Sequence, residues 1–322
     1  MRDEDKPARI NDVVPSSLGH LIGQRGVVAQ VAVALDAAFA DSQKFDDALL
    51  VGPPGLGKTQ VAKVIASELA SDLHEVLGQS IETSADLNAL LLGAKAKDVV
   101  FIDEVHELAK EHQTALYLAI DQRRIMLAGG STGRMPQVIP ISNFTLLLAT
   151  TDEYRLLAPL RDRMKLTLRF NFYDQNEVVQ IVKQRRRAVG WRVEEDVLPE
   201  IARRSRGTPR LALRLLQSCR RVCLAEGEMV ITIAHLRRAC ELEQLDDLGL
   251  GLIEQKYLEI LDPGGSRLNL IASMLGLPAR TVAEVSEPFL LRSGLVVKND
   301  QGRRILSSEG RGHLFAARVQ GI

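Results

Sequence analysis

The stretch DALLVGPPGLGKTQVAKVIASELA, residues 47–70, decides the fold. A short apolar run at residues 48–51 leads into a loop rich in glycine and proline, and a strongly helix-forming segment starts at Lys58. The letters GPPGLGKT match the pattern G-x-x-x-x-G-K-[ST] in full. The stretch therefore predicts a strand, a phosphate-binding loop and a helix in succession.

Such a loop wraps a triphosphate with inward-facing N–H groups, and the following helix adds the positive end of its dipole. Lys58 is expected to reach the β- and γ-phosphates, and the Thr59 hydroxyl to coordinate Mg²⁺. An incidental glycine and proline turn would not explain the strand before it and the helix after it. The predicted nucleotide-binding residues here are Gly52, Pro53, Pro54, Gly55, Leu56, Gly57, Lys58, Thr59 and Gln60.

A second chemical motif follows about 45 residues later. Residues 99–102, VVFI, are four β-formers that end in Asp103 and Glu104, which predicts a buried strand with carboxylates at its C-terminal edge. As a Walker B motif, Asp103 would hold hydrated Mg²⁺ and Glu104 would polarise the attacking water as general base. An ordinary strand ending in solvated acids has the same pattern, and the preceding P-loop favours the Walker B interpretation.

Two further positions near the predicted site carry polar groups. Residues 145–149 predict another buried strand that ends in Thr150 and Thr151, where a hydroxyl can reach the γ-phosphate or the water. Arg161 and Arg163 precede the strand at residues 166–170. Arginine pairs usually lie on solvated surface, but a guanidinium acting in trans on a neighbour's γ-phosphate is the alternative, and it implies an oligomer.

The pattern from residue 174 to about residue 246 is wholly helical. Thr208 suits an N-cap and Pro209 the first helical position, so Arg210 falls in the first turn, where it opposes the helix dipole. An anionic partner such as a phosphate would explain that placement. In the same segment Cys219 and Cys223 lie on an apolar stripe, which indicates reduced core residues rather than metal ligands.

The last segment predicts a winged helix, with helices at 253–261, 268–275 and 279–293 and a hairpin at 295–298 and 303–306. From residue 292 onward six lysines and arginines stand against two acids. A basic wing fits contact with DNA phosphates, and a protein-docking module is the alternative. Residues 124–127 and 138–141 flank a glycine-rich stretch, which indicates either a protruding hairpin or a plain surface loop.

Composition limits the other possibilities. The chain of 322 residues has 46% hydrophobic and 25% charged residues, which is ordinary for a globular protein of two or three domains. Its apolar runs are too short to span a bilayer and its N-terminus is charged, so we expect no membrane contact and a cytoplasmic location. The 41 basic and 41 acidic residues balance, so only a local patch can attract nucleic acid.

These motifs together resemble the RuvB family of AAA+ motors that drive Holliday-junction branch migration, over nearly the whole chain. The segments that carry the resemblance are GPPGLGKT, FIDEVH, ATT, PLRDR, IARRSRGTPR and EPFL, in this order. The resemblance implies an α/β AAA+ P-loop domain with a parallel sheet at residues 1–173, a small helical lid at 174–246 and a winged-helix DNA-binding domain at 247–322. It also implies ATP and Mg²⁺ as cofactors, a homo-hexameric ring on duplex DNA, and a RuvA-like junction-binding partner.

Residue roles follow from the matching motifs. Thr151 resembles sensor 1, Arg163 the arginine finger with Arg161 as second choice, and Arg210, after Pro209, sensor 2. Ile22 and Tyr173 match the adenine-contacting positions. The expected DNA-binding residues are Arg303, which matches the wing arginine, with Arg304 and Arg311.

The chain also departs from the family pattern. Val14 precedes Pro15 where an arginine is usual, Asp152 replaces a basic residue after the sensor, Met164 replaces an aromatic residue, residues 299–302 lack an arginine, and the hairpin at 124–141 keeps little of the usual sequence. That hairpin is where a RuvA-like partner would dock. We therefore carry two hypotheses: a translocating, RuvB-like DNA motor, and an ATP-gated switch or clamp-loader-like protein that does not translocate.

Overall fold

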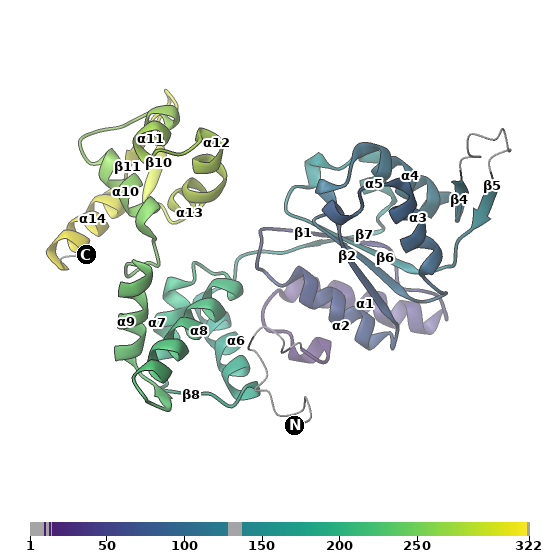
Figure 1. The fold of residues 1–322 in the computed structure, drawn as a ribbon, viewed down its shortest axis with the longest axis horizontal. Helices are drawn as coiled ribbons and strands as arrows, with labels where there is room; N and C mark the ends of the chain where they lie inside the picture. The colour runs from purple at the N-terminus through teal and green to yellow at the C-terminus, as the bar shows by residue number, and fades with distance from the viewer. Residues whose placement is uncertain (1–9, 11–12, 14, 128–136, 321–322) are drawn as a thin grey trace. The chain divides into compact units, whose positions relative to one another are not determined.

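The computed structural model describes residues 10, 13, 15–127 and 137–320 (Figure 1). The chain divides into two units, Met1–Glu177 and Val178–Ile322, and each is described by itself. No helix among the described residues is both long enough and apolar enough to cross a membrane.

The first unit is built on a five-stranded parallel sheet, as the sequence predicted. In spatial order the strands are β2 (Leu73–Leu77), β3 (Val99–Asp103), β6 (Thr145–Thr150), β1 (Ala48–Val51) and β7 (Leu166–Arg169). Every residue of β6 is buried, because strands pair on both of its edges and helices cover both faces of the sheet. The C-terminal ends of β1, β3 and β6 therefore meet at one edge of the sheet.

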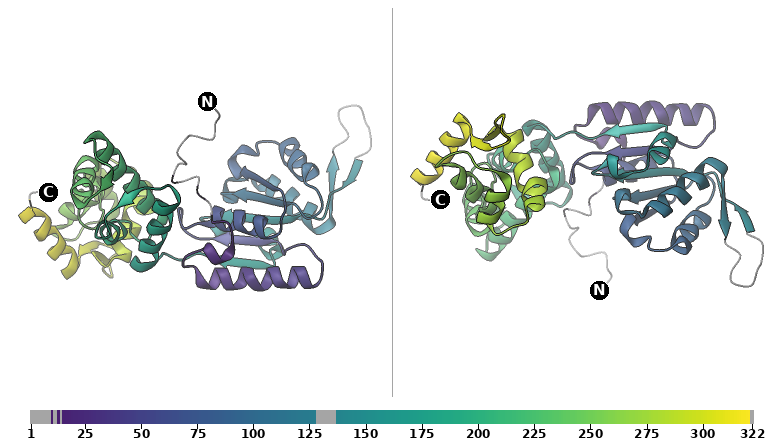
Figure 2. Two further views of the ribbon diagram at one scale, coloured as in Figure 1. Left: turned by 90° about the horizontal axis from the view of Figure 1, so that it is seen from below. Right: turned by 90° about the horizontal axis from the view of Figure 1, so that it is seen from above.

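Helices cover the two faces of this sheet (Figure 2). On one face α1 (Arg25–Ala40) and α2 (Lys58–Glu68) form an apolar core, and on the other α3 (Ser84–Gly93), α4 (Lys110–Gln122) and α5 (Ala158–Arg163) form a second. Successive residues of a strand point to opposite faces of the sheet and so pack into different cores. Phe101 and Leu147 belong to the first core, and Ile102 and Leu148 belong to the second. The single-turn segments of this unit are η2 (Leu18–His20), η3 (Gly78–Ser80), η4 (Val105–Glu107) and η5 (Glu153–Arg155).

The hairpin predicted after α4 is confirmed. β4 (Arg124–Leu127) and β5 (Gln137–Pro140) pair antiparallel and extend from the α4 side of the first unit (Figure 1). Its connecting stretch, residues 128–136, lies outside the described residues. Met126 and Val138 are exposed, so the described part of the hairpin presents apolar side chains to solvent.

The beginning of the second unit is mainly helical. Its helices are α6 (Gln175–Ala188), α7 (Val197–Arg204), α8 (Pro209–Ala225) and α9 (Ile233–Glu243). The prediction of a wholly helical segment was wrong in one detail, because β8 (Arg192–Val193) and β9 (Val230–Ile231) pair in parallel. The prediction for the cysteines is confirmed: all three are free and buried, and burial raises the pKa of Cys219 to about 12.

The rest of the second unit forms a winged helix. Its elements are α10 (Leu252–Leu261), α11 (Leu268–Leu275), α12 (Ala279–Thr281), the π-helical segment η6 (Val282–Ser286), α13 (Glu287–Arg292), β10 (Val296–Lys298), β11 (Arg304–Leu306) and α14 (Ser308–Gln320). The helix predicted at 279–293 is confirmed as an unbroken helical run over residues 279–292. Its turn before Pro288 widens to a π-helix, because Pro288 cannot donate a backbone hydrogen bond. Helix α14 was not predicted from the sequence, because its glycines mask its helical pattern. A Cβ on Gly310 would lie 2.1 Å from the Leu295 oxygen, so this glycine allows close packing.

Candidate active site

The P-loop joins β1 to α2 through backbone that favours glycine. Gly55 and Gly57 have φ values of 79° and 98°, which side-chain-bearing residues rarely adopt, and Gly57 is the N-cap residue of α2. A Cβ on Gly52 would lie 2.8 Å from Phe170, at the end of the neighbouring β7. The glycines of the motif are thus required by the geometry, and a loop of this shape converges its N–H groups on an anion.

Lys58 lies in the first turn of α2 with its side chain buried. Its Nζ donates hydrogen bonds to the backbone oxygens of Gly52, at 2.6 Å, and Pro53, at 3.1 Å. These two backbone carbonyls hold the ammonium inside the loop. Phosphate oxygens would form stronger, charge-assisted hydrogen bonds with the same donor.

Thr59 and Asp103 bring two oxygen ligands together from different elements. The Thr59 hydroxyl, on α2, donates to Asp103 Oδ2 at 3.0 Å, and Asp103 is the last residue of β3. The other Asp103 oxygen accepts the Glu104 N–H at 2.9 Å, which fixes the carboxylate. A hydroxyl and a carboxylate beside a phosphate loop suit Mg²⁺, which prefers a few protein oxygens, substrate phosphates and water.

Glu104 follows β3 in a left-handed conformation, with φ of 49°. Its backbone oxygen would lie 2.6 Å from a Cβ at Gly78, so η3 packs closely beneath this turn. The Thr151 hydroxyl donates to Glu104 Oε2 at 3.3 Å, and the Glu104 side chain is 37% exposed. A carboxylate that is oriented yet open to solvent can accept a proton from water.

The two threonines at the C-terminal end of β6, Thr150 within the strand and Thr151 directly after it, have separate partners. Thr150 is fully buried, and its hydroxyl oxygen lies 3.1 Å from His106 Nδ1 and accepts the Asp152 N–H at 3.0 Å. Thr151 instead reaches Glu104. No role was predicted for His106 from the sequence, in which its place two residues after Glu104, in FIDEVH, is its only mark.

Tyr173 and the segment before α1 pack against the P-loop and against each other. The Tyr173 hydroxyl donates to the Leu56 backbone oxygen at 3.0 Å, and a Cβ on Gly23 would lie 2.7 Å from the Tyr173 ring. Burial raises the pKa of Tyr173 to about 12, so the phenol stays neutral. Ile22 is half-buried next to Gly23. The structure thus brings the Ile22 and Tyr173 segments together at the P-loop, and their contact with adenine stays a prediction.

The two arginines of PLRDR lie on α5. Arg163 Nε donates to Asp121 Oδ1 of α4 at 2.8 Å, and the Arg161 guanidinium lies 5.5 Å from the centre of the Tyr154 ring. Both described contacts are to neighbouring elements of the same face rather than to the P-loop. Action on a neighbouring subunit stays a prediction for both residues.

The expected sensor 2 residues belong to the second unit. Thr208 is the N-cap residue of α8 and Pro209 its first residue, as predicted, although the Thr208 side chain makes no capping hydrogen bond. Arg210 is exposed in the first helical turn. Its contact with a nucleotide stays a prediction.

Three family models cover the chain. They are the Holliday junction DNA helicase RuvB P-loop domain at residues 13–170, the RuvB AAA lid domain at 173–246 and the RuvB C-terminal winged helix domain at 247–315. The chain belongs to the RuvB family.

The chain is similar to relatives over most of its own length and most of theirs. The Holliday junction branch migration complex subunit RuvB of Nocardia farcinica is 39% identical over 294 residues, which is 90% of this chain and 82% of that protein. The subunit of the same name from Kosmotoga olearia is 36% identical over 314 residues, or 96% and 91%. A mutant of Thermotoga maritima RuvB matches with a TM-score of 0.82 and 35% identity, covering 94% of this chain and 99% of that one. Another structure, the Thermotoga maritima RuvB Holliday junction branch migration motor, has a TM-score of 0.79.

Two departures from the usual RuvB sequence have a place in the structure. Asp152 Oδ1 accepts the Tyr154 N–H at 3.1 Å and so caps η5 directly after the sensor. Met164 is buried in the core that includes α4 and α5, where an aromatic residue is usual. Val14, the third departure, lies outside the described residues.

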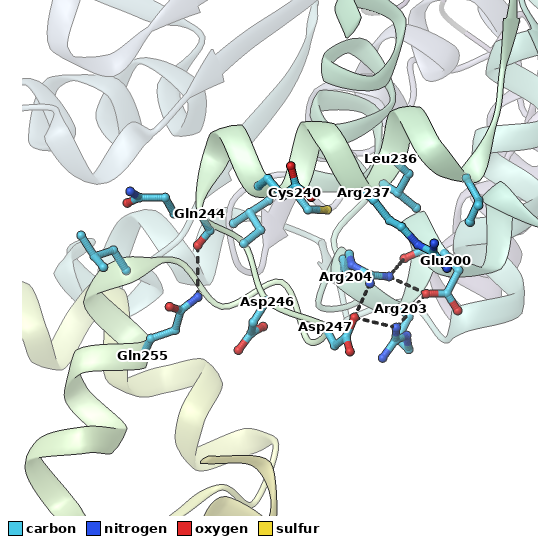
Figure 3. A pocket seen from close by; sticks show the side chains of 14 residues that line it. Glu200, Arg203, Arg204, Leu236, Arg237, Cys240, Gln244, Asp246, Asp247 and Gln255 are labelled. Carbon is cyan, nitrogen blue, oxygen red and sulfur yellow. Dashed lines mark hydrogen bonds and ion pairs between the residues drawn. The ribbon is translucent and has the colours of Figure 1, made fainter. Parts of the chain in front are cut away.

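Two arginines of the RuvB-like IARRSRGTPR segment, Arg203 and Arg204, line a pocket of about 900 Å³ in the second unit (Figure 3). Arg203 donates to Glu200 at 2.7 Å and to Asp247 at 3.3 Å, and Arg204 binds the same two carboxylates. These hydrogen bonds hold the pKa of Glu200 below its usual value. The charges are paired with one another, so the cluster ties α7 to the linker that leads into α10.

Arg206 extends this connection to the winged helix. It donates to Glu254 at 2.9 Å and to the Gly249 oxygen, and its guanidinium lies 4.9 Å from the centre of the Phe289 ring. Gly249 has φ of 72°, and a Cβ there would lie 2.1 Å from the Arg204 oxygen. The first part of this RuvB motif therefore has a structural role, and only its end begins α8.

The three arginines expected to bind DNA differ in their exposure and contacts. Arg303 and Arg311 are exposed, whereas Arg304 pairs with Glu287, from Nε to Oε1 at 2.6 Å. Arg304 thus holds the wing to α13, and a DNA role for it would compete with this ion pair. Burial alone would raise the pKa of Glu287, but hydrogen bonds from Arg304, Tyr257 and Lys298 hold it below its usual value. The side chain of Arg318, counted among the basic residues, lies outside the described residues.

Proposed function

We propose that this chain is the ATP-hydrolysing subunit of a ring-shaped motor that moves duplex DNA at a Holliday junction. The observation that carries the proposal is the meeting of Lys58, the Thr59–Asp103 pair and the Thr151–Glu104 pair at one edge of the sheet. The names of the relatives supply the DNA substrate, since they are subunits of a Holliday junction branch migration complex.

Each part of the site has a distinct task in this proposal. The P-loop and Lys58 bind the triphosphate, and Thr59 and Asp103 hold Mg²⁺, which neutralises phosphate charge when bound. Glu104 orients the attacking water and accepts its proton, while Thr151 contacts the γ-phosphate. Arg163 of an adjacent subunit, with Arg161 as second choice, stabilises the charge that develops on the phosphate.

The same proposal includes the assembly and the partners. We infer an oligomer, because an arginine acting in trans requires a neighbour, and the resemblance to the RuvB family implies that it is a homo-hexamer. We keep the division into parts at residues 1–173, 174–246 and 247–322. The exposed Met126 and Val138 of the β4–β5 hairpin support docking of a RuvA-like protein there. Arg303 and Arg311 are available for DNA phosphates because both are exposed.

The decisive experiment measures steady-state ATPase activity without DNA, with linear duplex and with a four-way junction. Lys58→Ala is the blank, and a junction-dissociation assay with a RuvA-like protein follows. Stimulation by DNA that falls with added salt, together with ATP-dependent junction movement, is the expected result. Hydrolysis without any movement of the junction would instead support the ATP-gated switch, which the names of the relatives do not favour.

Action in trans is tested by mixing Arg163→Ala with Lys58→Ala. The two variants complement each other's defects, because a ring holding both contains intact sites that pair a wild-type Lys58 with a neighbour's wild-type Arg163. Activity that rises above the sum of the separate variants is expected. A strictly additive result would remove Arg163 as a finger acting on the neighbour.

A further inference from the structure

His106 lies at the centre of the polar contacts behind the general base. Its side chain, in η4, is only 10% exposed. Nδ1 lies 3.3 Å from Glu104 Oε2 and 3.1 Å from the Thr150 hydroxyl, and Nε2 lies 3.2 Å from Glu107 Oε1. The imidazole therefore touches the Walker B glutamate and the end of β6 with one nitrogen.

The surroundings of the ring are defined. The charged groups that face it are Glu104 and Glu107, and Arg155 of η5 neutralises Glu107 through a 2.8 Å hydrogen bond. β6 contributes the Thr150 hydroxyl, and η3, which packs against η4, contains no ionisable side chain. Because two acids and a hydroxyl surround a nearly buried ring, the position of its protons decides which contacts are attractive.

Nδ1 offers two arrangements to Glu104. When Nδ1 carries a proton, it donates to the Glu104 carboxylate or to Thr150 Oγ1. When Nδ1 carries no proton, it accepts a hydrogen bond from the Thr150 hydroxyl, and its lone pair faces Glu104 Oε2. The first arrangement holds the carboxylate and the second releases it, while Thr151 remains its other hydrogen-bond donor.

We propose that His106 is a positioning residue, which orients the Glu104 carboxylate and couples it to Thr150 at the sensor end of β6. Any shift of β6 in response to the γ-phosphate would then reach Glu104 by two routes, directly through Thr151 and through Thr150 and His106. This inference rests on the proposed role of Glu104 as general base.

Two substitutions separate the contacts of the ring. His106→Asn keeps an amide group where Nδ1 stood, near Glu104 and Thr150, whereas His106→Gln places its amide toward the Nε2 side, near Glu107. We expect His106→Gln to lower kcat about tenfold or more, with KM for ATP nearly unchanged, because a misplaced base slows the chemical step without weakening binding. His106→Asn should restore most of the lost turnover.

The pH profile supplies a readout that a purely structural role would not change. The dependence of log kcat on pH in the wild type should differ from that of both His106 variants. His74→Gln is the matched control, because His74 of β2 also pairs with a carboxylate through one ring nitrogen, Nε2 with Asp98 at 2.8 Å, and Gln keeps an amide on that side. It should keep the wild-type profile.

The outcomes distinguish this inference from the function on which it rests. Equal kcat in His106→Asn and His106→Gln, with the wild-type pH profile retained in both, would overturn the role of His106. Glu104→Gln is measured in the same assay. If that variant turns over normally, the assignment of the base itself is wrong, and the positioning role is overturned with it.

Discussion

The two units use their charged side chains in different ways. At the sheet edge of the first unit, Glu104 keeps 37% of its side chain exposed and has Thr151 as its hydrogen-bond donor. In the second unit, Glu287 is only 3% exposed and accepts hydrogen bonds from Arg304 and Tyr257, with Lys298 close by. The Glu104 carboxylate can therefore contact solvent, whereas all the described partners of the Glu287 carboxylate belong to the fold.

The difference follows from what burial does to an ion. A buried charge is tolerated only where its hydrogen-bonding capacity is filled, so Glu287 cannot release a partner without a large penalty. A half-exposed carboxylate such as Glu104 stays hydrated and can change partners during a reaction. A family motif can therefore contain a catalytic carboxylate or a structural one, and only the contacts of the carboxylate distinguish the two roles.

The largest effect is expected from Glu104→Gln. Turnover should fall roughly a hundredfold to ten-thousandfold while ATP binding persists, because the amide can hydrogen-bond but cannot accept a proton from water. ATPase assays and nucleotide-binding titrations measure the two properties separately. Glu111→Gln, on the exposed side of α4, is the control and should behave as wild type. Normal turnover in Glu104→Gln would show that Glu104, like Glu287, does not act in catalysis.

Glu287→Gln should show the opposite behaviour. It leaves Arg304 without a charged partner in a buried site, so unfolding of the second unit should become easier by about 3 kcal/mol. Trp191, the only tryptophan of the chain, lies in this unit but outside the part at 247–322 that holds Glu287, so far-UV circular dichroism is recorded together with its fluorescence during denaturant unfolding. Glu284→Gln is the matched control, because its pair with Arg280 is exposed and should contribute less than about 1 kcal/mol. Equal stability of the two variants would contradict the structural role of Glu287.

A pH dependence sharpens the same comparison. The pKa of Glu287 is lower in the folded chain than in an unfolded one, so its ion pair stabilises the fold above the unfolded-state pKa. That stabilisation is lost as the pH falls through the folded-state pKa. The urea midpoint reported by these two signals should therefore fall on acidification more steeply in the wild type than in Glu287→Gln. Parallel curves would show that Glu287 does not contribute to acid sensitivity.

The smallest effect is expected at the wing. Arg303→Ala should weaken duplex binding modestly, reduce the slope of log affinity against log salt by about 1, and leave stability unchanged. Arg304→Ala is the comparison, because it removes the ion pair with Glu287 and should therefore lower the stability of the second unit. Salt-dependent binding titrations and the same unfolding assay distinguish the two arginines. A stable Arg304→Ala variant with the larger binding defect would reverse the assignment.

The sequence predicted the first unit best. A full P-loop and three uninterrupted apolar strands specify a parallel sheet, since only strands buried on both faces read as continuous hydrophobic runs. The sequence also placed Asp103 and Glu104 at a strand end. It did not predict His106, because a histidine two residues beyond an acid has no distinctive pattern until the fold brings Thr150 beside it.

The second unit was harder to predict for a physical reason. Arg203, Arg204, Arg206 and Arg304 look like exposed basic residues in the sequence, and their partners Asp247, Glu254 and Glu287 lie 17 to 48 residues away along the chain. Pairing at such distances depends on tertiary packing, which local patterns do not encode. The glycine-containing α14 was missed for the same reason, since the close approach of Gly310 to the Leu295 oxygen depends on tertiary packing.

The position of β6 has a consequence for how the protein is made. The P-loop follows β1 and the Walker B acids end β3, but β6 lies between these two strands and occurs later in the chain than either. During synthesis the central place in the sheet therefore stays open until residues 145–150 have left the ribosome. Because the sheet is completed by non-local pairing, this step is intrinsically slow. A nascent chain that ends before Thr145 has both halves of the ATP site but no strand to join them.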